Sequence, residues 1–253
     1  MTSADECRAM HAANRARWNA DALSGGGQKD MGRNWRAVWE QPQQGLDPEE
    51  WAWIGDPADR DIAVLGSGDN LAVFALAARG ARVTSVDISD EQLAIAAARA
   101  GEVGADVRFL RADMAELDAL ATGSFDLVYT GGHVAVWLAD LRRAYAEAGR
   151  ILHRGGRLVV GEYHPIRRLW DRSGAHFDLL TSYFARGPFH YEVDGLSAYE
   201  WHWTSADLIS AVQQAGCDLL AVEEYGDEAE QWEPVDLRGL PRQLLIVGEK
   251  QAT

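Results

Sequence analysis

Val64-Leu65-Gly66-Ser67-Gly68-Asp69-Asn70 joins a short apolar run to a segment with helical spacing. Glycines between a buried strand and a helix let the backbone approach a ligand and expose amides at the helix N-terminus. Asp87 follows Gly68 by 19 residues, at the end of the next apolar run. An acid at that place accepts hydrogen bonds from ribose hydroxyls. This order predicts a nucleoside-binding βαβ unit, and the alternative is an ordinary turn that needs glycine only for packing.

The glycine pattern differs from two common phosphate-binding motifs. A dinucleotide fingerprint that starts at Gly66 requires a glycine at position 71, which is Leu71 here. The phosphate loop GxxxxGK[ST] does not occur in the sequence either. The motif therefore favours an adenosine ligand without a pyrophosphate.

Strand-like and helical segments alternate through the rest of the chain. We expect strands at about 61–65, 81–87, 107–110, 125–130, 157–163, 219–225 and 243–248. Helices are expected at about 69–79, 89–99 and 204–214, with a long helix that ends near 154–156. Short apolar runs that alternate with helical patterns are typical of a parallel sheet. The predicted fold class is α/β, a Rossmann-like, seven-stranded, mostly parallel sheet with helices on both faces.

Two stretches depart from this alternation. Residues 1–57 hold five of the ten tryptophans and little strand pattern, which predicts an N-terminal helical cap. Residues 58–253 form the remaining domain in this prediction. Within it, residues 166–200 are too long and irregular for an ordinary connection, so we expect a cap-like insertion there.

The amino-acid composition limits the kinds of ligand and macromolecule that the protein is expected to bind. The 253 residues include 39 Asp and Glu against 24 Lys and Arg, a formal net charge of −15, which argues against nucleic acid as a partner. Cys7 and Cys217 make no disulfide framework, and the seven histidines show no metal-binding pattern. The N-terminus has no secretory signal, and no apolar run is long enough to cross a membrane. We expect a cytoplasmic protein with a small-molecule partner and no metal; a homodimer is allowed.

Five segments in the correct order resemble the motifs of class I S-adenosylmethionine-dependent methyltransferases. VLGSGDN resembles the glycine-rich first motif, and VTSVDIS resembles the second, with Asp87 as the ribose acid. RADM at 111–114 resembles the adenine-pocket segment. SFDLVYTGG at 124–132 and ILHRGGRLVV at 151–160 resemble the motifs of the fourth and fifth strands. The closing strand pair also fits this family, whose last strand is antiparallel.

The resemblance implies S-adenosylmethionine as the cofactor and S-adenosylhomocysteine as its product. It implies that Asp113 accepts a hydrogen bond from the adenine amino group and that Met114 packs on the adenine ring. It also implies that Trp18, on an N-terminal helix, covers the cofactor. The complete predicted cofactor site comprises Trp18, Gly66, Ser67, Gly68, Asp69, Asp87, Ile88, Asp113, Met114, Thr130 and Gly131.

Two positions depart from the family pattern. Val64 stands where the family usually has an acid, and Asn70 stands where it usually has a third glycine. Asparagine tolerates a left-handed backbone or caps a helix, so the loop still forms in either case. The missing acid leaves the methionine amino group without its usual partner, and Asp69 is a candidate replacement.

Candidate catalytic residues follow the fourth and fifth strands. Methyl transfer needs an aligned acceptor, and an O- or N-acceptor also needs a base. His133 and His164 lie where open α/β sheets bind ligands, and histidine titrates near neutrality. The alternative for each is a structural hydrogen bond to a neighbouring loop, and His164-Pro165 alternatively shapes the turn. For Glu162 the structural role is the favoured interpretation.

The predicted function is methyl transfer from S-adenosylmethionine to a small organic acceptor, by in-line displacement, at an oxygen, nitrogen or carbon atom in secondary metabolism. We place the acceptor between His133, His164 and the 166–200 insertion. Intramolecular cyclisation of the same cofactor and non-catalytic cofactor binding remain alternatives. A nicotinamide-dependent oxidoreductase is less favoured because of Leu71.

Overall fold

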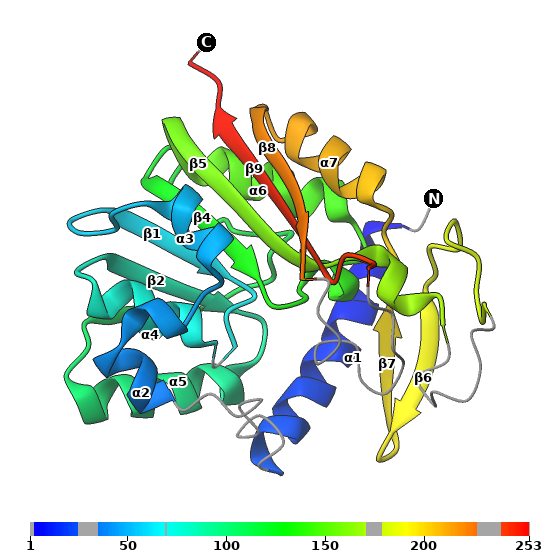
Figure 1. Cartoon of the computed structure of the whole chain (residues 1–253). Coiled ribbons are helices and arrows are strands. Elements are labelled where there is room, and N and C mark those ends of the chain that lie inside the picture. The colour runs from blue at the N-terminus through cyan, green and yellow to red at the C-terminus, as the bar shows by residue number, and fades with distance from the viewer. Residues whose placement is uncertain (1–2, 25–34, 69, 171–178, 227–238, 253) are drawn as a thin grey trace.

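A seven-stranded sheet forms the centre of the protein, whose computed structural model describes residues 3–24, 35–68, 70–170, 179–226 and 239–252. The strand order is β3-β2-β1-β4-β5-β9-β8 (Figure 1). The strands are β1 (Asp61–Leu65), β2 (Arg82–Asp87), β3 (Val107–Arg111), β4 (Phe125–Gly131), β5 (Leu152–Tyr163), β8 (Cys217–Tyr225) and β9 (Gln243–Lys250). β9 is antiparallel to both of its neighbours, and the other neighbouring pairs are parallel. The predicted α/β class with its mostly parallel sheet is confirmed.

Helices cover both faces of this sheet. The helices are α1 (Ala4–Leu23), α2 (Trp35–Glu40), α3 (Pro48–Ile54), α4 (Leu71–Ala78), α5 (Asp90–Val103), α6 (Leu141–Ile151) and α7 (Ser205–Gln214). Val64 belongs to the apolar cluster under α3 and α4, whereas the next residue, Leu65, belongs to the cluster under α6 and α7. Because β1 is buried on both faces, it reads as a continuous apolar run instead of an alternating one.

Helix α1 connects the sheet to a two-stranded hairpin of β6 (Phe189–Val193) and β7 (Leu196–Glu200), as Figure 1 shows. The side chain of Asn14 donates to the backbone oxygen of Tyr199 (2.9 Å) and accepts from its backbone nitrogen (2.8 Å). Asn14 thus takes the place of a neighbouring strand. At the other side of α1, Asn19 accepts a hydrogen bond from the Ser89 hydroxyl (2.6 Å).

Two details differ from the sequence prediction. The helix expected to end near 154–156 ends at Ile151, because β5 begins at Leu152 and accommodates Gly155 at φ +76°. The 166–200 insertion, expected to be irregular, contains the β6–β7 hairpin. Asp194-Gly195 at its turn is a recognised hairpin signal between alternating residues. The domain division at residue 58 stays a prediction.

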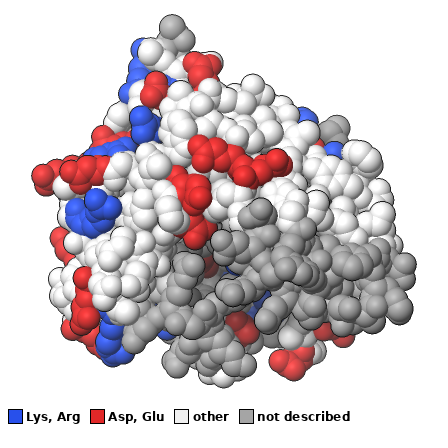
Figure 2. Space-filling view, viewed as in Figure 1, with Lys and Arg blue, Asp and Glu red and all other residues white. Residues whose placement is uncertain are grey.

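The described surface reflects the acidic composition. Figure 2 shows acidic side chains in a band across the middle of this face, with Lys and Arg side chains mostly toward its left side. The described part of this face therefore offers no continuous basic surface of the kind that nucleic acids require. In the described residues, none of the helices combines the length and the apolar composition needed to cross a bilayer.

Gly149 allows α6 to approach the end of α7 closely. A Cβ atom at this position would overlap the backbone oxygen of Ala215 and lie 3.0 Å from its side chain. We expect Gly149→Ala to lower the free energy of unfolding by about 1–3 kcal/mol, measured by chemical denaturation, because overpacking forces the backbone to shift. Gly101→Ala in α5 is the control, since nothing lies within 4 Å of its Cβ position. That change should raise stability by about 0.5–1 kcal/mol; equal effects would contradict the packing argument.

Candidate functional site

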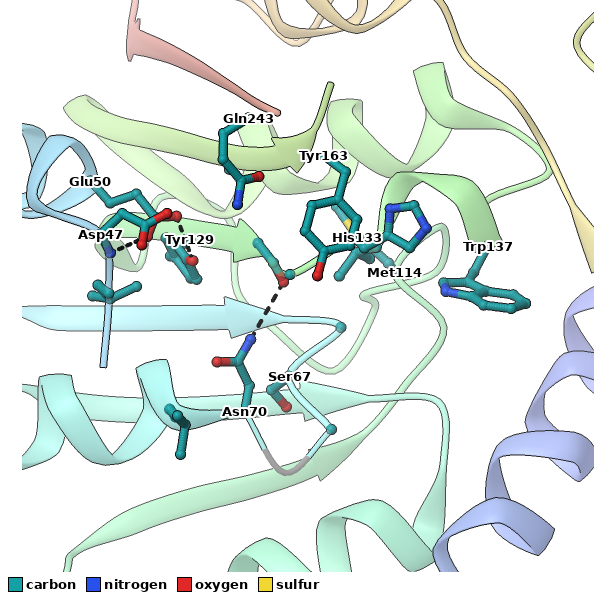
Figure 3. A pocket seen from close by; sticks show the side chains of 18 of the residues that line it. Asp47, Glu50, Ser67, Asn70, Met114, Tyr129, His133, Trp137, Tyr163 and Gln243 are labelled. Atoms are coloured by element: carbon teal, nitrogen blue, oxygen red, sulfur yellow. Dashed lines mark hydrogen bonds between the residues drawn. The ribbon is translucent and has the colours of Figure 1, made fainter. Parts of the chain in front are cut away.

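A cavity of about 1360 Å³ opens at the carboxyl ends of β1, β2, β4 and β5 (Figure 3). Open α/β sheets bind ligands at this edge, and a typical small-molecule pocket measures about 300–1,000 Å³. The volume is therefore sufficient for more than one small molecule. Ten of the predicted site residues line it: Trp18, Gly66, Ser67, Gly68, Asp87, Ile88, Asp113, Met114, Gly131 and His133.

The glycine turn after β1 forms the floor of this cavity. Gly66 and Gly68 have φ values of +62° and +48°, and a Cβ atom on Gly66 would lie 2.5 Å from a methyl group of Val134. Ser67 turns its hydroxyl toward β2, where it contacts the Ser85 hydroxyl at 2.8 Å. The turn is thus held against β2 by the Ser67 side chain, and its backbone faces the cavity.

The structure explains Asn70, one of the two departures from the family pattern. Its φ is −58°, so the backbone is not left-handed, and its side-chain oxygen accepts a hydrogen bond from the Ala72 nitrogen (2.8 Å). Asn70 is therefore the N-cap of α4, one of the two alternatives that the sequence left open. Asp69, predicted to contact the cofactor, lies outside the described residues.

The Asp87 carboxylate is fixed in place by two backbone amides. Gly68 donates to one oxygen at 2.7 Å, and Ser89 donates to the other at 2.7 Å. Gln92, one turn into α5, is 5% exposed and also lines the cavity. The side-chain oxygen of Gln92 is buried and has no hydrogen-bond partner among the described residues. Because an unpaired buried acceptor is unfavourable, this oxygen is suited to a hydroxyl of a bound molecule.

The loop after β3 carries the second fixed carboxylate. The Ala139 nitrogen donates to Nε2 of His11 (2.8 Å), so the proton of this ring is on Nδ1, which donates to Asp113 (2.6 Å). Burial raises the pKa of Asp113, but the hydrogen bonds from His11 and the Ala115 nitrogen outweigh it and leave the pKa below its ordinary value. Asp113 is thus an ionised acceptor, and Met114 lies beside it in the cavity wall.

Two tryptophans close the α1 side of the cavity. Trp18 meets Trp137 edge-to-face, with ring centroids 5.1 Å apart, and both rings line the cavity. The guanidinium of Arg17 lies 4.7 Å from the centre of the Trp18 ring. The predicted covering position of Trp18 is compatible with this arrangement, although its contact with a cofactor stays a prediction.

Gly131 and Thr130 lie on opposite faces of β4. Gly131 lines the cavity, and a side chain there would overlap the Tyr129 hydroxyl. Thr130 is fully buried, and among the described residues its hydroxyl has no hydrogen-bond partner and Thr130 does not line the cavity. The Thr130 side chain is therefore not placed to contact a cofactor in this cavity.

His133 enters the cavity from a strained turn. Its φ is +81°, a region that costs a non-glycine residue about 1–3 kcal/mol. Its ring lies against Tyr163, with centroids 4.7 Å apart, and Arg168 donates a hydrogen bond to its Nε2. Burial and the charge of Arg168 hold the pKa of His133 well below its ordinary value. The imidazole is therefore neutral, with its proton on Nδ1.

Glu162 supports this turn from beneath. One of its oxygens accepts hydrogen bonds from the nitrogens of Val134 (3.0 Å) and Ala135 (2.8 Å), and the other lies 4.0 Å from Nδ1 of His133. Burial raises the pKa of Glu162 to about 7, although the two backbone hydrogen bonds act to lower it. The favoured structural interpretation of Glu162 agrees with these contacts.

His164 is held away from the cavity wall. Its Nδ1 accepts from the Ile166 nitrogen (3.3 Å), and its Nε2 donates to Glu224 (2.8 Å). It is not among the described residues that line the cavity. These contacts match the turn-shaping alternative, in which His164 has no catalytic role. No described residue of the 166–200 insertion lines the cavity either, because the hairpin packs on α1.

The sequence did not indicate an acidic wall at the α3 end of the cavity. Glu50 accepts hydrogen bonds from the Tyr129 hydroxyl (2.8 Å) and the Asp47 nitrogen (2.8 Å), as Figure 3 shows. Tyr129 pairs in register with Val64, the position that lacks the family's acid. The Asp47-Pro48-Glu49-Glu50 capping pattern could have located α3, but not its contact with β4. No three described His, Cys, Asp or Glu side chains gather at a metal-binding distance.

Glu162 should make stability depend on pH. Its folded pKa of about 7 lies above the ordinary value of 4.5. The stabilisation from the protonated carboxyl is therefore fully present below about pH 4.5 and is lost as the pH rises through about 7. Glu162→Gln should remove this loss, which amounts to about 3 kcal/mol at roughly 1.4 kcal/mol per pKa unit.

Chemical denaturation at pH 5 and pH 8 measures this difference. The control is Glu192→Gln at an exposed position of β6, which should follow the pH dependence of the unmodified chain. A parallel pH dependence in Glu162→Gln and the unmodified chain would show that Glu162 is ionised at both pH values.

The comparisons with known proteins identify methyltransferases. The family described as "Methyltransferase domain" matches residues 63–160. The demethylmenaquinone methyltransferase of Thermus thermophilus is 39% identical over 105 residues, 42% of this chain and 46% of that protein. This chain thus matches about half the length of that relative. The ubiquinone/menaquinone biosynthesis C-methyltransferase of Rhizobium meliloti is 34% identical over 192 residues, 69% of this chain and 71% of that protein.

Solved structures share the fold. The S-adenosylmethionine-dependent methyltransferase from Mesorhizobium loti superposes with a TM-score of 0.64 at 24% identity, over 80% of this chain and 96% of that one. At this identity the likeness concerns the fold alone, and the family rests on the sequence match to the Rhizobium meliloti relative. The chain belongs to the class I S-adenosylmethionine-dependent methyltransferases.

Proposed function

We propose that this chain transfers the methyl group of S-adenosylmethionine to a small organic acceptor. The observation that carries the proposal is the Asp87 carboxylate, which two backbone amides hold at the glycine turn inside a cavity large enough for cofactor and acceptor. The names of the relatives, which concern menaquinone and ubiquinone, support a small-molecule acceptor. The acidic surface disfavours nucleic acid.

The residues present fit the adenosine part of the cofactor. Asp87 and the buried, unpartnered oxygen of Gln92 supply acceptors for ribose hydroxyls. Side chains at Gly66 or Gly68 would be strained, and one at Gly66 would also meet Val134. Asp113 supplies an ionised acceptor for the adenine amino group. The bound cofactor supplies an already activated methyl group.

His133 is the proposed base for an acceptor that must lose a proton. It is neutral and lines the cavity, as a base must. In the structure its Nε2 accepts a hydrogen bond from Arg168, so proton uptake at this atom requires the guanidinium to turn away. Glu162, near Nδ1, then faces the imidazolium and stabilises it. Trp18 and Trp137 line the α1 side of the cavity.

A titration tests the proposed function. S-adenosylmethionine and S-adenosylhomocysteine, each at 100 times its dissociation constant, should stabilise the chain by about 2.7 kcal/mol in thermal or chemical denaturation, and NAD should not. Stabilisation by NAD alone would contradict the proposal. Mass analysis of products then separates the reactions: methylation adds a methyl group to an acceptor, whereas cyclisation or inert binding leaves every acceptor unchanged.

Asp87 offers a residue-level test. Asp87→Ala should weaken S-adenosylhomocysteine binding by about 2–3 kcal/mol in isothermal titration, because charge-assisted hydrogen bonds to the ribose are lost. Asp61→Ala is the control. Asp61 pairs with Arg82 at the amino-terminal ends of β1 and β2, far from the cavity, so this change should leave the affinity unchanged. If Asp87→Ala binds as tightly as the unmodified chain, the ribose is not held at the end of β2.

A further inference from the structure

Arg242 is held by its backbone at the edge of the cavity. Its nitrogen donates to the Tyr225 oxygen at the end of β8 (3.0 Å), and its oxygen accepts from the His164 nitrogen after β5 (2.7 Å). Its side chain lines the cavity. These two hydrogen bonds fix the point from which the guanidinium reaches the site.

The guanidinium of Arg242 has no hydrogen-bonding or ion-pair partner among the described residues, and its Nε is buried. Arg168 is paired with Glu200 and Arg150 with Glu147, whereas Nε and Nη1 of Arg17 are also buried without a hydrogen-bond partner among the described residues. The guanidinium thus lies at the cavity wall without a carboxylate partner among the described residues, and such a position is suited to an anion that arrives with a ligand.

The surroundings of Arg242 are aromatic. Its guanidinium carbon lies 5.7 Å from the centre of the Tyr163 ring, and that of Arg167 lies 3.8 Å from it. Figure 3 shows Tyr163, His133 and Trp137 in succession toward one end of the cavity. An aromatic wall of this kind stacks on a flat ring. This end of the cavity therefore combines aromatic side chains with the positive charge of Arg242.

The opposite end of the cavity has the opposite charge. Asp47 and Glu50 lie there beside Tyr129, away from His133 in Figure 3. Glu224 also lines the cavity near Arg242, where its carboxylate accepts a hydrogen bond from His164. An anionic ligand is thus repelled at the α3 end and attracted at the Tyr163 end.

We propose that the methyl acceptor is a planar aromatic acid whose carboxylate pairs with Arg242 while its ring lies along Tyr163 and His133. The inference rests on the proposed function and specifies its acceptor. Arginine binds a carboxylate through two parallel hydrogen bonds, which fix orientation as well as affinity. The ring is thereby placed next to the proposed base.

A matched pair of probes tests this proposal: 3,4-dihydroxybenzoate and its uncharged amide, titrated calorimetrically into the complex with S-adenosylhomocysteine. The acid should bind about tenfold or more tightly than the amide. Arg242→Gln should abolish this difference by weakening the acid alone, and Arg242→Lys should retain part of it. Arg79→Gln is the control, because Arg79 lies over the Trp51 ring outside the cavity.

The measurements also show whether Arg242 binds the carboxylate of the acceptor or that of the cofactor. The cofactor also carries one, so S-adenosylhomocysteine affinity is measured for each variant and should stay within about twofold in Arg242→Gln. A loss of that affinity, with the acid-to-amide ratio unchanged, would assign Arg242 to the cofactor and overturn the proposal. Equal binding of acid and amide, or binding of neither to the complex, would overturn it as well. Failure of S-adenosylhomocysteine itself to bind would instead refute the proposed function.

Discussion

The Asp87 carboxylate joins two parts of the proposed cofactor site. By accepting hydrogen bonds from the Gly68 and Ser89 nitrogens, it ties the glycine turn after β1 to the start of α5. The turn can adopt this shape only because Gly66 and Gly68 tolerate positive φ values. The same carboxylate therefore fixes the loop and presents a charge-assisted acceptor in the cavity. The proposed adenosine site depends on this one arrangement.

Local patterns predicted most of this region, and long-range contacts explain the rest. The turn, Asp87 and the seven strands follow from apolar runs and glycine positions close together in the sequence. His133 and His164 both follow strand ends, yet only His133 lines the cavity, because His164 is bound by Ile166 and by the distant Glu224. The contact of His164 with Glu224, like the contact between Glu50 and Tyr129, joins residues far apart in the sequence, so local sequence patterns could not predict it.

The departures from the family pattern acquire a physical interpretation in the structure. Asn70, at the position where the family usually has a glycine, caps α4. Val64 replaces an acid in the apolar cluster under α3, and acidic side chains enter the cavity nearby from the α3 segment instead. The cavity consequently has an acidic end at Asp47 and Glu50 and a basic, aromatic end at Arg242 and Tyr163. A cavity with two oppositely charged ends is suited to orienting two different bound molecules, here the cofactor and the acceptor.

The central claim is that the carboxyl end of β2 holds an adenosine by its sugar. A crystal structure of the chain with S-adenosylhomocysteine tests it most directly. The account predicts both ribose hydroxyls within hydrogen-bonding distance of the Asp87 carboxylate and the adenine beside Asp113 and Met114. A ligand that makes no contact with Asp87, or a ribose bound away from the carboxyl end of β2, would contradict it.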